Sequence, residues 1–547
     1  MTGLTIDYWR LLPALLPVAG VVAVLVLDLV TPRLRRAPYA IALVAALGAA
    51  AATVPGLRLG AGETLSTLCL SGAASDLPAV PGLPQTCFWQ AGALGSTLQL
   101  AAASAAAVTI VLGWPWAGGR VRDEYTGTVS PERRTDGSGN EPIEAVLLLT
   151  ALTGAIVVAA SRDMGTWLIA LELATLPIIA LIALSGTRAA VAGSVQLLMT
   201  SLVSFAILTL GVAFWFAASG SPFFTAGAAI AAESAQGGRG VLALGVILIL
   251  TGVGFKLSLV PFHAWTPTAY AGSRTAVAAF LATVSKLGGL AALLVVLQAL
   301  TAIGPAALIV IAVLSIASMT LGNLMALRQD DVVRLLAWST VAQAGWVVLP
   351  LVSMSTGGDR AAATYLLTYV VATLVAFSVV GMTVREQPSR GRTLTAYTGL
   401  WQRSPWRAGA LALALTSLAG LPPGVIGLVG KVAALRPVVS EGWIWLAVIA
   451  AANAVLGVAV YTRWLRPVIT TGTPAGVLAP SMREVTVEAE TSEVEEGAPT
   501  RPVGPGARLT LVHRPLDRAA LMLALVIATV VLVAVSVQPD LLLGLLG

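Results

Sequence analysis

The sequence predicts an all-α polytopic membrane protein with about fourteen transmembrane helices. Two observations predict it. Hydrophobic residues make up 57% of the 547 residues and charged residues only 11%, against about 25% charged residues in an ordinary soluble domain. Apolar stretches of about 20 residues, the length that crosses a bilayer, also recur along the chain. So few charges cannot cover an aqueous surface, which excludes the classes of water-soluble enzymes.

The apolar stretches define the predicted spans in chain order. The first lacks a preceding basic region and a small-residue cleavage site, so we expect it to remain as a span rather than be removed as a signal peptide. The predicted spans are approximately 11–30, 38–56, 97–116, 143–160, 164–184, 191–217, 240–260, 275–299, 305–327, 332–352, 361–384, 408–435, 443–464 and 519–538.

The basic residues predict the orientation. Of 32 basic residues only three are lysines, so 29 are arginines. With the N-terminus outside, 23 arginines fall in cytoplasmic segments and six in extracytoplasmic ones. Cytoplasmic loops of membrane proteins are enriched in basic residues, so this ratio favours fourteen spans with both termini extracytoplasmic.

The same order divides the chain into five parts. They are an N-terminal three-helix segment (1–142), a first five-helix repeat (143–299), a second (305–465), a flexible cytoplasmic insertion (466–518) and a last transmembrane helix (519–547). Five is odd, so two such groups would have inverted topology. A cytoplasmic loop at 117–141 is also predicted to be flexible, and the acidic cluster within the long insertion could dock a partner.

The extracytoplasmic loop 57–96 contains the two cysteines, Cys69 and Cys87. That compartment permits disulfides, so we expect a bond between them, with two free thiols as the alternative. Two cysteines cannot make a four-ligand metal site, and with only two histidines in the chain we expect no metal or haem bound by protein ligands.

Away from the span ends, four charged residues fall inside predicted spans: Glu172, Lys256, Lys286 and Lys431. Each uncompensated charge costs about 2.5–3.5 kcal/mol at the bilayer centre by insertion scales, so these side chains must face protein or a hydrated cavity. Buried ion pairs are the simpler explanation, but one glutamate can neutralise only one lysine. Arginine does not lose its proton in a protein whereas buried lysine can, so the membrane interior holds the titratable charges. A GC-rich genome would explain the arginines but not the position of the lysines.

Prolines lie next to two of these lysines. Pro261 follows Lys256, and Pro422 and Pro423 precede Lys431. Proline frees backbone carbonyls that lipid cannot satisfy, so we expect discontinuous seventh and twelfth helices. A simple kink is the alternative for each proline alone. Broken helices beside a charge near the membrane midplane are typical of transporters.

Several ordered segments identify a family. The chain resembles the proton-translocating, antiporter-like membrane subunits of respiratory complex I, and the N-subunit type most closely. The likeness covers about residues 140–465. It rests on FKLSLVPFHAWTPTAY (255–270), AAFLATVSK (278–286), LGNLMALRQDDVVRLLAWSTVAQAGW (321–346), LTSLAGLPPGVIGLVGK (415–431) and the ALELATLP context of Glu172.

The resemblance implies a role for each ionisable residue. Glu172 would pair with Lys256, Lys286 would be the central lysine of the pathway, and Lys431 would face the outside. His263 would lie at the cytoplasmic mouth, as a polar structural element or in direct proton transfer.

Two glutamines depart from the family pattern. Gln196 stands where many relatives have a lysine, and Gln343 where many have a histidine. Glutamine can hydrogen-bond water but cannot titrate, so both weaken any proposal of proton transfer through those positions.

The sequence predicts no redox site in this chain, because no nucleotide-binding or phosphate-binding motif and no cysteine cluster occurs. The resemblance implies that NADH, FMN, iron–sulfur clusters and quinone bind to partner subunits of an NADH-quinone oxidoreductase. It also implies neighbouring membrane subunits on both sides, membrane lipids, no nucleic acid, and a bacterial cytoplasmic (inner) membrane. The alternatives are a subunit of a multi-subunit Na⁺/H⁺ antiporter, of a membrane-bound hydrogenase, or an unrelated permease.

Overall fold

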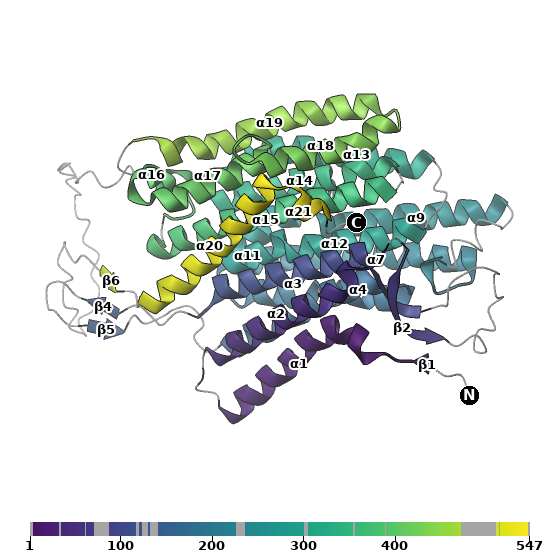
Figure 1. Ribbon diagram of the computed structural model, residues 1–547, viewed down its shortest axis with the longest axis horizontal. Coiled ribbons are helices and arrows are strands. Elements are labelled where there is room, and N and C mark those ends of the chain that lie inside the picture. Colours follow the sequence, from purple (N-terminus) through teal and green to yellow (C-terminus); the bar gives the residue numbers. More distant parts are fainter. Residues whose placement is uncertain are drawn as a thin grey trace, which may run out of the picture.

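A computed structural model confirms the all-α prediction (Figure 1). The structure describes residues 4–31, 34, 36–60, 62–70, 87–115, 120–122, 129–131, 140–225, 236–299, 305–353, 356–388, 390–471, 510–512 and 515–544. Within this part of the chain, twelve helices are long and apolar enough to cross a membrane. The other two predicted spans correspond to the interrupted helix within 405–440 and to the C-terminal helix, so each of the fourteen predicted spans coincides with helix.

Three helices precede the first predicted repeat: α1 (Tyr8–Val30), α2 (Ala37–Leu57) and α3 (Ala93–Gly113). Small residues let α2 and α3 pack closely. Ala42, Ala46 and Ala49 recur at helical spacing on α2 and are fully buried, and Ala103 and Ala106 are buried on α3. Such small-residue faces allow membrane helices to approach through van der Waals contact.

A small antiparallel sheet covers one end of these helices. It has the order β1 (Leu4–Thr5), β2 (Thr64–Leu70) and β3 (Cys87–Gly92). Cys69 and Cys87 lie directly opposite each other in the β2–β3 register and form a disulfide. The predicted disulfide is therefore present.

The next helices cover the first predicted repeat, and the elements after them cover the second and the C-terminus. The first group comprises α4 (Glu141–Ala160), α5 (Met164–Leu173), α6 (Leu176–Ala183), α7 (Arg188–Ser219), α9 (Gln236–Leu257), α10 (Trp265–Gly272), α11 (Thr275–Ala282) and α12 (Val284–Ala299). The second comprises α13 (Pro305–Ala326), α14 (Val332–Val348), η1 (Leu349–Ser353), α15 (Thr356–Glu386), η2 (Leu394–Tyr397), α16 (Leu400–Arg403), α17 (Pro405–Ala419), α18 (Val425–Ser440) and α19 (Ile444–Ile469).

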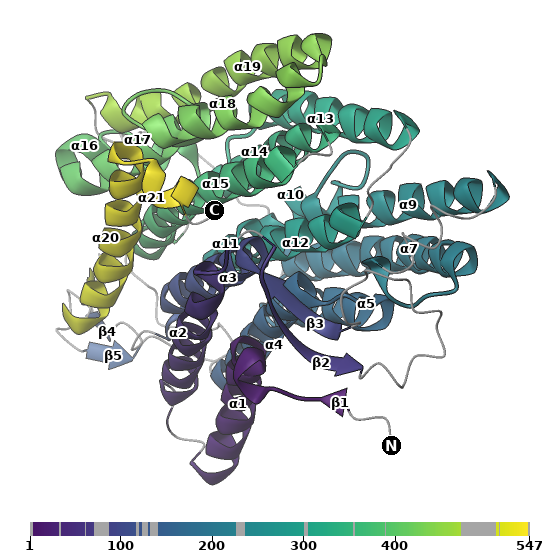
Figure 2. The same ribbon diagram turned by 45° about the vertical axis from the view of Figure 1, so that its right-hand side comes forward.

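The two groups meet where α10 packs on α14 and α11 on α15 (Figure 2). The C-terminal helices α20 (Pro515–Val537) and α21 (Asp540–Leu543) follow, and α20 packs across α15, α3 and α18. Figures 1 and 2 both show α20 inclined to the other helices. The inverted relation of the two groups stays a prediction.

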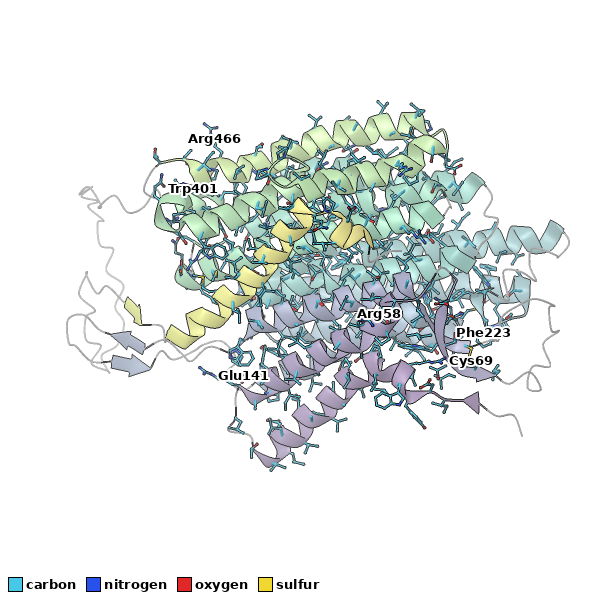
Figure 3. The ribbon with its side chains drawn as sticks, viewed as in Figure 1. Arg58, Cys69, Glu141, Phe223, Trp401 and Arg466 are labelled. Carbon is cyan, nitrogen blue, oxygen red and sulfur yellow. A yellow bond between two sulfur atoms is a disulfide. The ribbon has the colours of Figure 1, made fainter. Side chains whose placement is uncertain are left out.

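Residues of loops predicted on opposite sides of the membrane lie toward opposite ends of the bundle. Cys69 and Phe223, both predicted outside, lie at one end, while Glu141, Trp401 and Arg466 lie toward the other (Figure 3). Which end faces the cytoplasm stays a prediction. Three short strands, β4 (Arg120–Arg122), β5 (Val129–Pro131) and β6 (Thr510–Val512), form a second sheet inside the two segments that we predict to be flexible. Most of those two segments, including the acidic cluster, lies outside the described residues.

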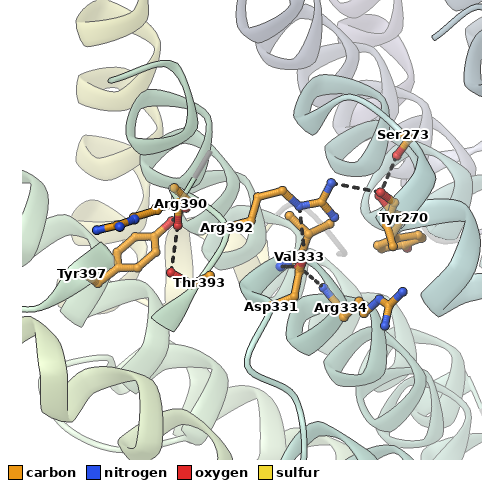
Figure 4. Close-up of polar contacts among 11 residues, drawn as sticks. Tyr270, Ser273, Asp331, Val333, Arg334, Arg390, Arg392, Thr393 and Tyr397 are labelled. Atoms are coloured by element: carbon orange, nitrogen blue, oxygen red, sulfur yellow. Dashed lines mark hydrogen bonds and ion pairs between the residues drawn. The ribbon is translucent and has the colours of Figure 1, made fainter. Parts of the chain in front are cut away.

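Side-chain contacts tie the helices together at the predicted cytoplasmic end. Arg392 bonds both the carboxylate of Asp331, at 3.1 Å from Nε, and the carbonyl of Ala271 at the end of α10, at 2.9 Å (Figure 4). Glu144 on α4 accepts hydrogen bonds from Tyr39 on α2 and from Arg274, which precedes α11. These contacts fix α10 and α11 against both neighbouring groups of helices.

Within the described residues, four of the predicted spans are interrupted. The predicted breaks in the seventh and twelfth spans occur between α9 and α10 and between α17 and α18. Two further interruptions were not predicted, at 174–175 between α5 and α6 and at Thr283 between α11 and α12. At both, a threonine hydroxyl bonds the carbonyl four residues earlier, Thr175 to Leu171 and Thr283 to Ala279. Such back-bonding competes with the helix ladder and bends helices.

Candidate functional site

The four ionisable residues predicted inside the membrane lie close to these interruptions. Glu172 is one residue from the end of α5, and Lys256 is one residue from the end of α9. Lys286 lies in the first turn of α12, and Lys431 in the second turn of α18. The three lysines are only 2% to 7% exposed. Buried charges are stable only where polar groups surround them, and helix interruptions supply such groups.

The break after α9 exposes a carbonyl. In a continuous helix the carbonyl of Lys256 would accept the backbone N–H of Val260. Ser258 instead adopts a left-handed conformation (φ 66°), and the N–H of Val260 donates to Ser318 Oγ on α13, at 2.9 Å. The carbonyl of Lys256 is thereby left for another donor.

Lys286 supplies that donor. Its Nζ lies 2.9 Å from the Lys256 carbonyl oxygen and 2.5 Å from Ser258 Oγ, which also accepts the hydroxyl of Thr266 at 2.6 Å. The ammonium lies 4.7 Å from the ring centroid of Trp265. A carbonyl, a hydroxyl and an aromatic face therefore stabilise this charge without a carboxylate.

Glu172 and Lys256 interact at longer range. Their charges are near enough to affect each other, but among the described residues no ion pair within 4 Å joins them. Glu172 is also more exposed than the lysines. Among the described residues the two side chains are therefore not in direct contact, and a functional pairing of Glu172 with Lys256 stays a prediction.

The break before α18 provides an equivalent position for Lys431. Its ammonium donates to the carbonyl of Ala419, the last residue of α17. It lies 5.5 Å from the ring centroid of Trp346 on α14. The two halves of this interrupted helix approach so closely that a Cβ on Gly427 would lie 1.6 Å from the carbonyl oxygen of Ser417. Only glycine fits there.

Gln343 lies in a buried cluster of hydroxyl groups near Lys431. Its Oε1 accepts the hydroxyl of Tyr365, and its Nε2 lies 2.7 Å from the hydroxyl of Tyr461 and 3.3 Å from the carbonyl of Leu418. The hydroxyl of Tyr461 is 2.6 Å from Ser339 Oγ. Gln343 therefore has several protein partners rather than a purely aqueous surrounding.

The remaining residues that the sequence singled out lie at the break between α9 and α10. His263 is in the turn between α9 and α10, its ring 5.3 Å from that of Trp338, and its Nδ1 has no hydrogen-bond partner among the described residues. Gln196 on α7 donates to the carbonyl of Ala264 at 3.0 Å. Sequence reasoning did not single out Ser258, Trp265 or Trp346 as contacts of the lysines. Their positions in the quoted motifs were the available signal.

Comparisons with known proteins identify the family of the chain. The model of the NADH:quinone oxidoreductase/Mrp antiporter transmembrane family matches residues 161–457, more than half of the chain. NADH-quinone oxidoreductase subunit N of Salinispora tropica is 36% identical over 487 residues, which cover 86% of this chain and 87% of that relative. Subunit N 2 of Streptomyces griseus subsp. griseus is 33% identical over 474 residues, covering 84% and 82%.

Solved structures share the fold. A chain of respiratory complex I from Thermus thermophilus with bound aureothin has a TM-score of 0.69 and 26% identity, covering 97% of this chain and 98% of that one. A chain of the Mrp complex from Dietzia sp. DQ12-45-1b has a TM-score of 0.74 at 20% identity, covering 99% and 96%. The chain therefore belongs to the NADH:quinone oxidoreductase/Mrp antiporter transmembrane family, and within it to the relatives named subunit N of NADH-quinone oxidoreductase.

Proposed function

We propose that this chain is a membrane-arm subunit of an NADH-quinone oxidoreductase and moves protons across a bacterial cytoplasmic membrane. The pathway comprises Glu172, Lys256, Lys286 and Lys431, and quinone reduction in other subunits drives it. The relatives that match more than four fifths of this chain carry the name of that complex. They favour this function over an Na⁺/H⁺ antiporter or a hydrogenase.

The observation that carries the proposal is the placement of two buried ammonium groups on opened helix carbonyls. Lys286 and Lys431 each donate to a carbonyl at a helix break and lie over an indole ring. A lysine held by neutral groups can release its proton without leaving a buried carboxylate behind. A carboxylate partner would instead hold the charge tightly.

The order of transfer follows from these contacts. The carboxylate of Glu172 stabilises the charged form of Lys256 from a distance, so a displacement of that carboxylate favours release of the proton. The ammonium of Lys286 donates to the backbone carbonyl of Lys256, so the two residues meet at the same helix break, and Lys286 is the next carrier in the proposed order. Water would bridge the remaining gaps. Lys431 would then receive the proton and release it outside.

Other features belong to the same proposal. NADH, FMN, iron–sulfur clusters and quinone would be bound by partner subunits, and neighbouring membrane subunits would flank this chain. His263 would line the cytoplasmic mouth, and both termini would be extracytoplasmic. The division into an N-terminal segment, two inverted repeats and an insertion also remains part of this proposal.

Purification of the tagged chain from its native membrane tests the assignment to a complex. We expect NADH-dependent quinone reduction to purify with the chain, and vesicles containing the purified complex to take up or release protons when NADH and quinone are supplied. A chain that purifies without this activity, and exchanges Na⁺ for protons in vesicles, would contradict the proposal and identify an antiporter subunit instead.

A further inference from the structure

The paired prolines leave two adjacent carbonyls of α17 without backbone donors. In a helix the carbonyl of residue i accepts the N–H of residue i+4. The partners of Leu418 and Ala419 would be Pro422 and Pro423, and proline has no N–H. The nearest N–H groups point further back: that of Gly420 bonds the carbonyls of Thr416 and Ser417, and that of Leu421 bonds Thr416. Unpaired carbonyls at membrane depth are costly, so side chains must satisfy these two.

A different side chain donates a hydrogen bond to each of these two carbonyls. Lys431 donates to Ala419, and Gln343 donates to Leu418 from 3.3 Å. These two donors differ in chemistry. Lysine can gain and lose a proton, whereas the glutamine amide always carries its two N–H donors. When the ammonium of Lys431 changes its charge, the neighbouring carbonyl therefore keeps its partner.

The amide of Gln343 is itself fixed. Tyr365 donates to Oε1, while Nε2 is shared between Leu418 and the hydroxyl of Tyr461. Three partners from α15, α17 and α19 thus define both the rotamer and the direction of the amide, and the side chain is 5% exposed. A buried polar network with its groups satisfied is rigid.

The same amide also positions the ring under Lys431. Tyr365 stacks on Trp346 with ring centroids 5.7 Å apart and planes inclined by 22°. Trp346 in turn carries the ammonium of Lys431 on its face. Gln343 therefore holds the helix break directly, and holds the indole through Tyr365.

We propose that Gln343 is a positioning residue for Lys431: it keeps the broken end of α17 and the Trp346 ring in place while the lysine binds and releases its proton. This inference rests on the proposed function. It assigns a role without titration to a position that the resemblance associates with a histidine.

The test compares variants of the whole complex in membrane vesicles, with protons moved per NADH oxidised as the measurement. Because this ratio is taken per turnover, a variant that only lowers the amount of assembled complex leaves it unchanged. Gln343→Met removes both donor and acceptor at similar size. We expect its ratio to fall between that of the parent and that of Lys431→Met.

A conservative variant and a matched control complete the test. A neutral imidazole has one donor and one acceptor, so Gln343→His should restore most of the ratio. Gln99→Met on α3 also loses a buried amide-to-carbonyl bond, to Ile156 on α4, and should leave the ratio unchanged. A normal ratio in Gln343→Met, or equal losses in the Met and His variants, would overturn the inference alone. A normal ratio in Lys431→Met would overturn both this inference and the proposed use of Lys431.

Discussion

Gly420→Ala should disturb the position of Lys431 without changing any titratable group. Gly420 has a left-handed conformation (φ 79°), and a Cβ at that position would lie 3.0 Å from Cδ and 3.1 Å from Nζ of Lys431. The backbone strain costs about 1–2 kcal/mol. Displacement of the flexible lysine would weaken its bond to Ala419, and a charged hydrogen bond contributes about 1.5–3 kcal/mol.

A loss of that size changes the ratio of held to displaced ammonium by about tenfold or more. We therefore expect Gly420→Ala to assemble but to move fewer protons per NADH, measured with a pH-sensitive dye and NADH absorbance in the same vesicles. Gly409→Ala is the matched control, because a Cβ there meets nothing within 4 Å. If both alanine variants move as many protons per NADH as the parent, the contact between Lys431 and the helix break does not contribute to proton transfer.

Two further predictions concern stability. Replacement of Cys69 and Cys87 by serine should lower the thermal stability of the purified complex, because the disulfide closes a loop with a sequence separation of 18 and such loops contribute about 3 kcal/mol. An unchanged melting temperature, with and without reductant, would count against this. Glu144→Leu removes the acceptor shared by Tyr39 and Arg274 and should cost about 1–3 kcal/mol, seen as less assembled complex with a normal proton ratio. Glu386 supplies the control, because its side chain is 43% exposed where it pairs with Arg407, and Glu386→Gln should cost at most about 1 kcal/mol. Equal losses in these two variants would refute the distinction.

Hydropathy predicts the spans because lipid requires about 20 apolar residues whatever the neighbouring helices are. The breaks at Pro261 and at Pro422–Pro423 were predictable for a similar reason, since proline removes a backbone donor wherever it stands. The breaks after Leu173 and before Val284 each have a threonine hydroxyl that bonds a preceding carbonyl, but the same bond occurs inside intact helices, at Thr153 and Thr340. Threonine is also common in intact helices, so its presence alone does not predict a break.

The identity of the ionisable residues was predictable, but their partners were not. A lysine in an apolar stretch must be compensated, and the single glutamate left at least two lysines without a carboxylate. Which carbonyls would hold Lys286 and Lys431 depends on how α12 meets the end of α9, and how α18 returns along α17. Those contacts are tertiary. The partners of Gln343 are also set by tertiary contacts. From the sequence, Gln343 is only a position that lacks the titratable group of many relatives. In the structure, its amide donates to the carbonyl of Leu418.

Lys286→Met tests the central claim most directly. The Lys286 ammonium bonds the carbonyl of Lys256 and the hydroxyl of Ser258 at the break after α9, and it precedes Lys431 in the proposed pathway. The measurement is the number of protons moved per NADH by the assembled complex in sealed vesicles, with Gln99→Met, at a buried glutamine on α3 bonded to the carbonyl of Ile156, as a control of similar size. We predict that Lys286→Met assembles normally and loses the protons that this subunit contributes, while the control retains them. A parent-like proton ratio in an assembled Lys286→Met complex would contradict transfer through the buried lysines.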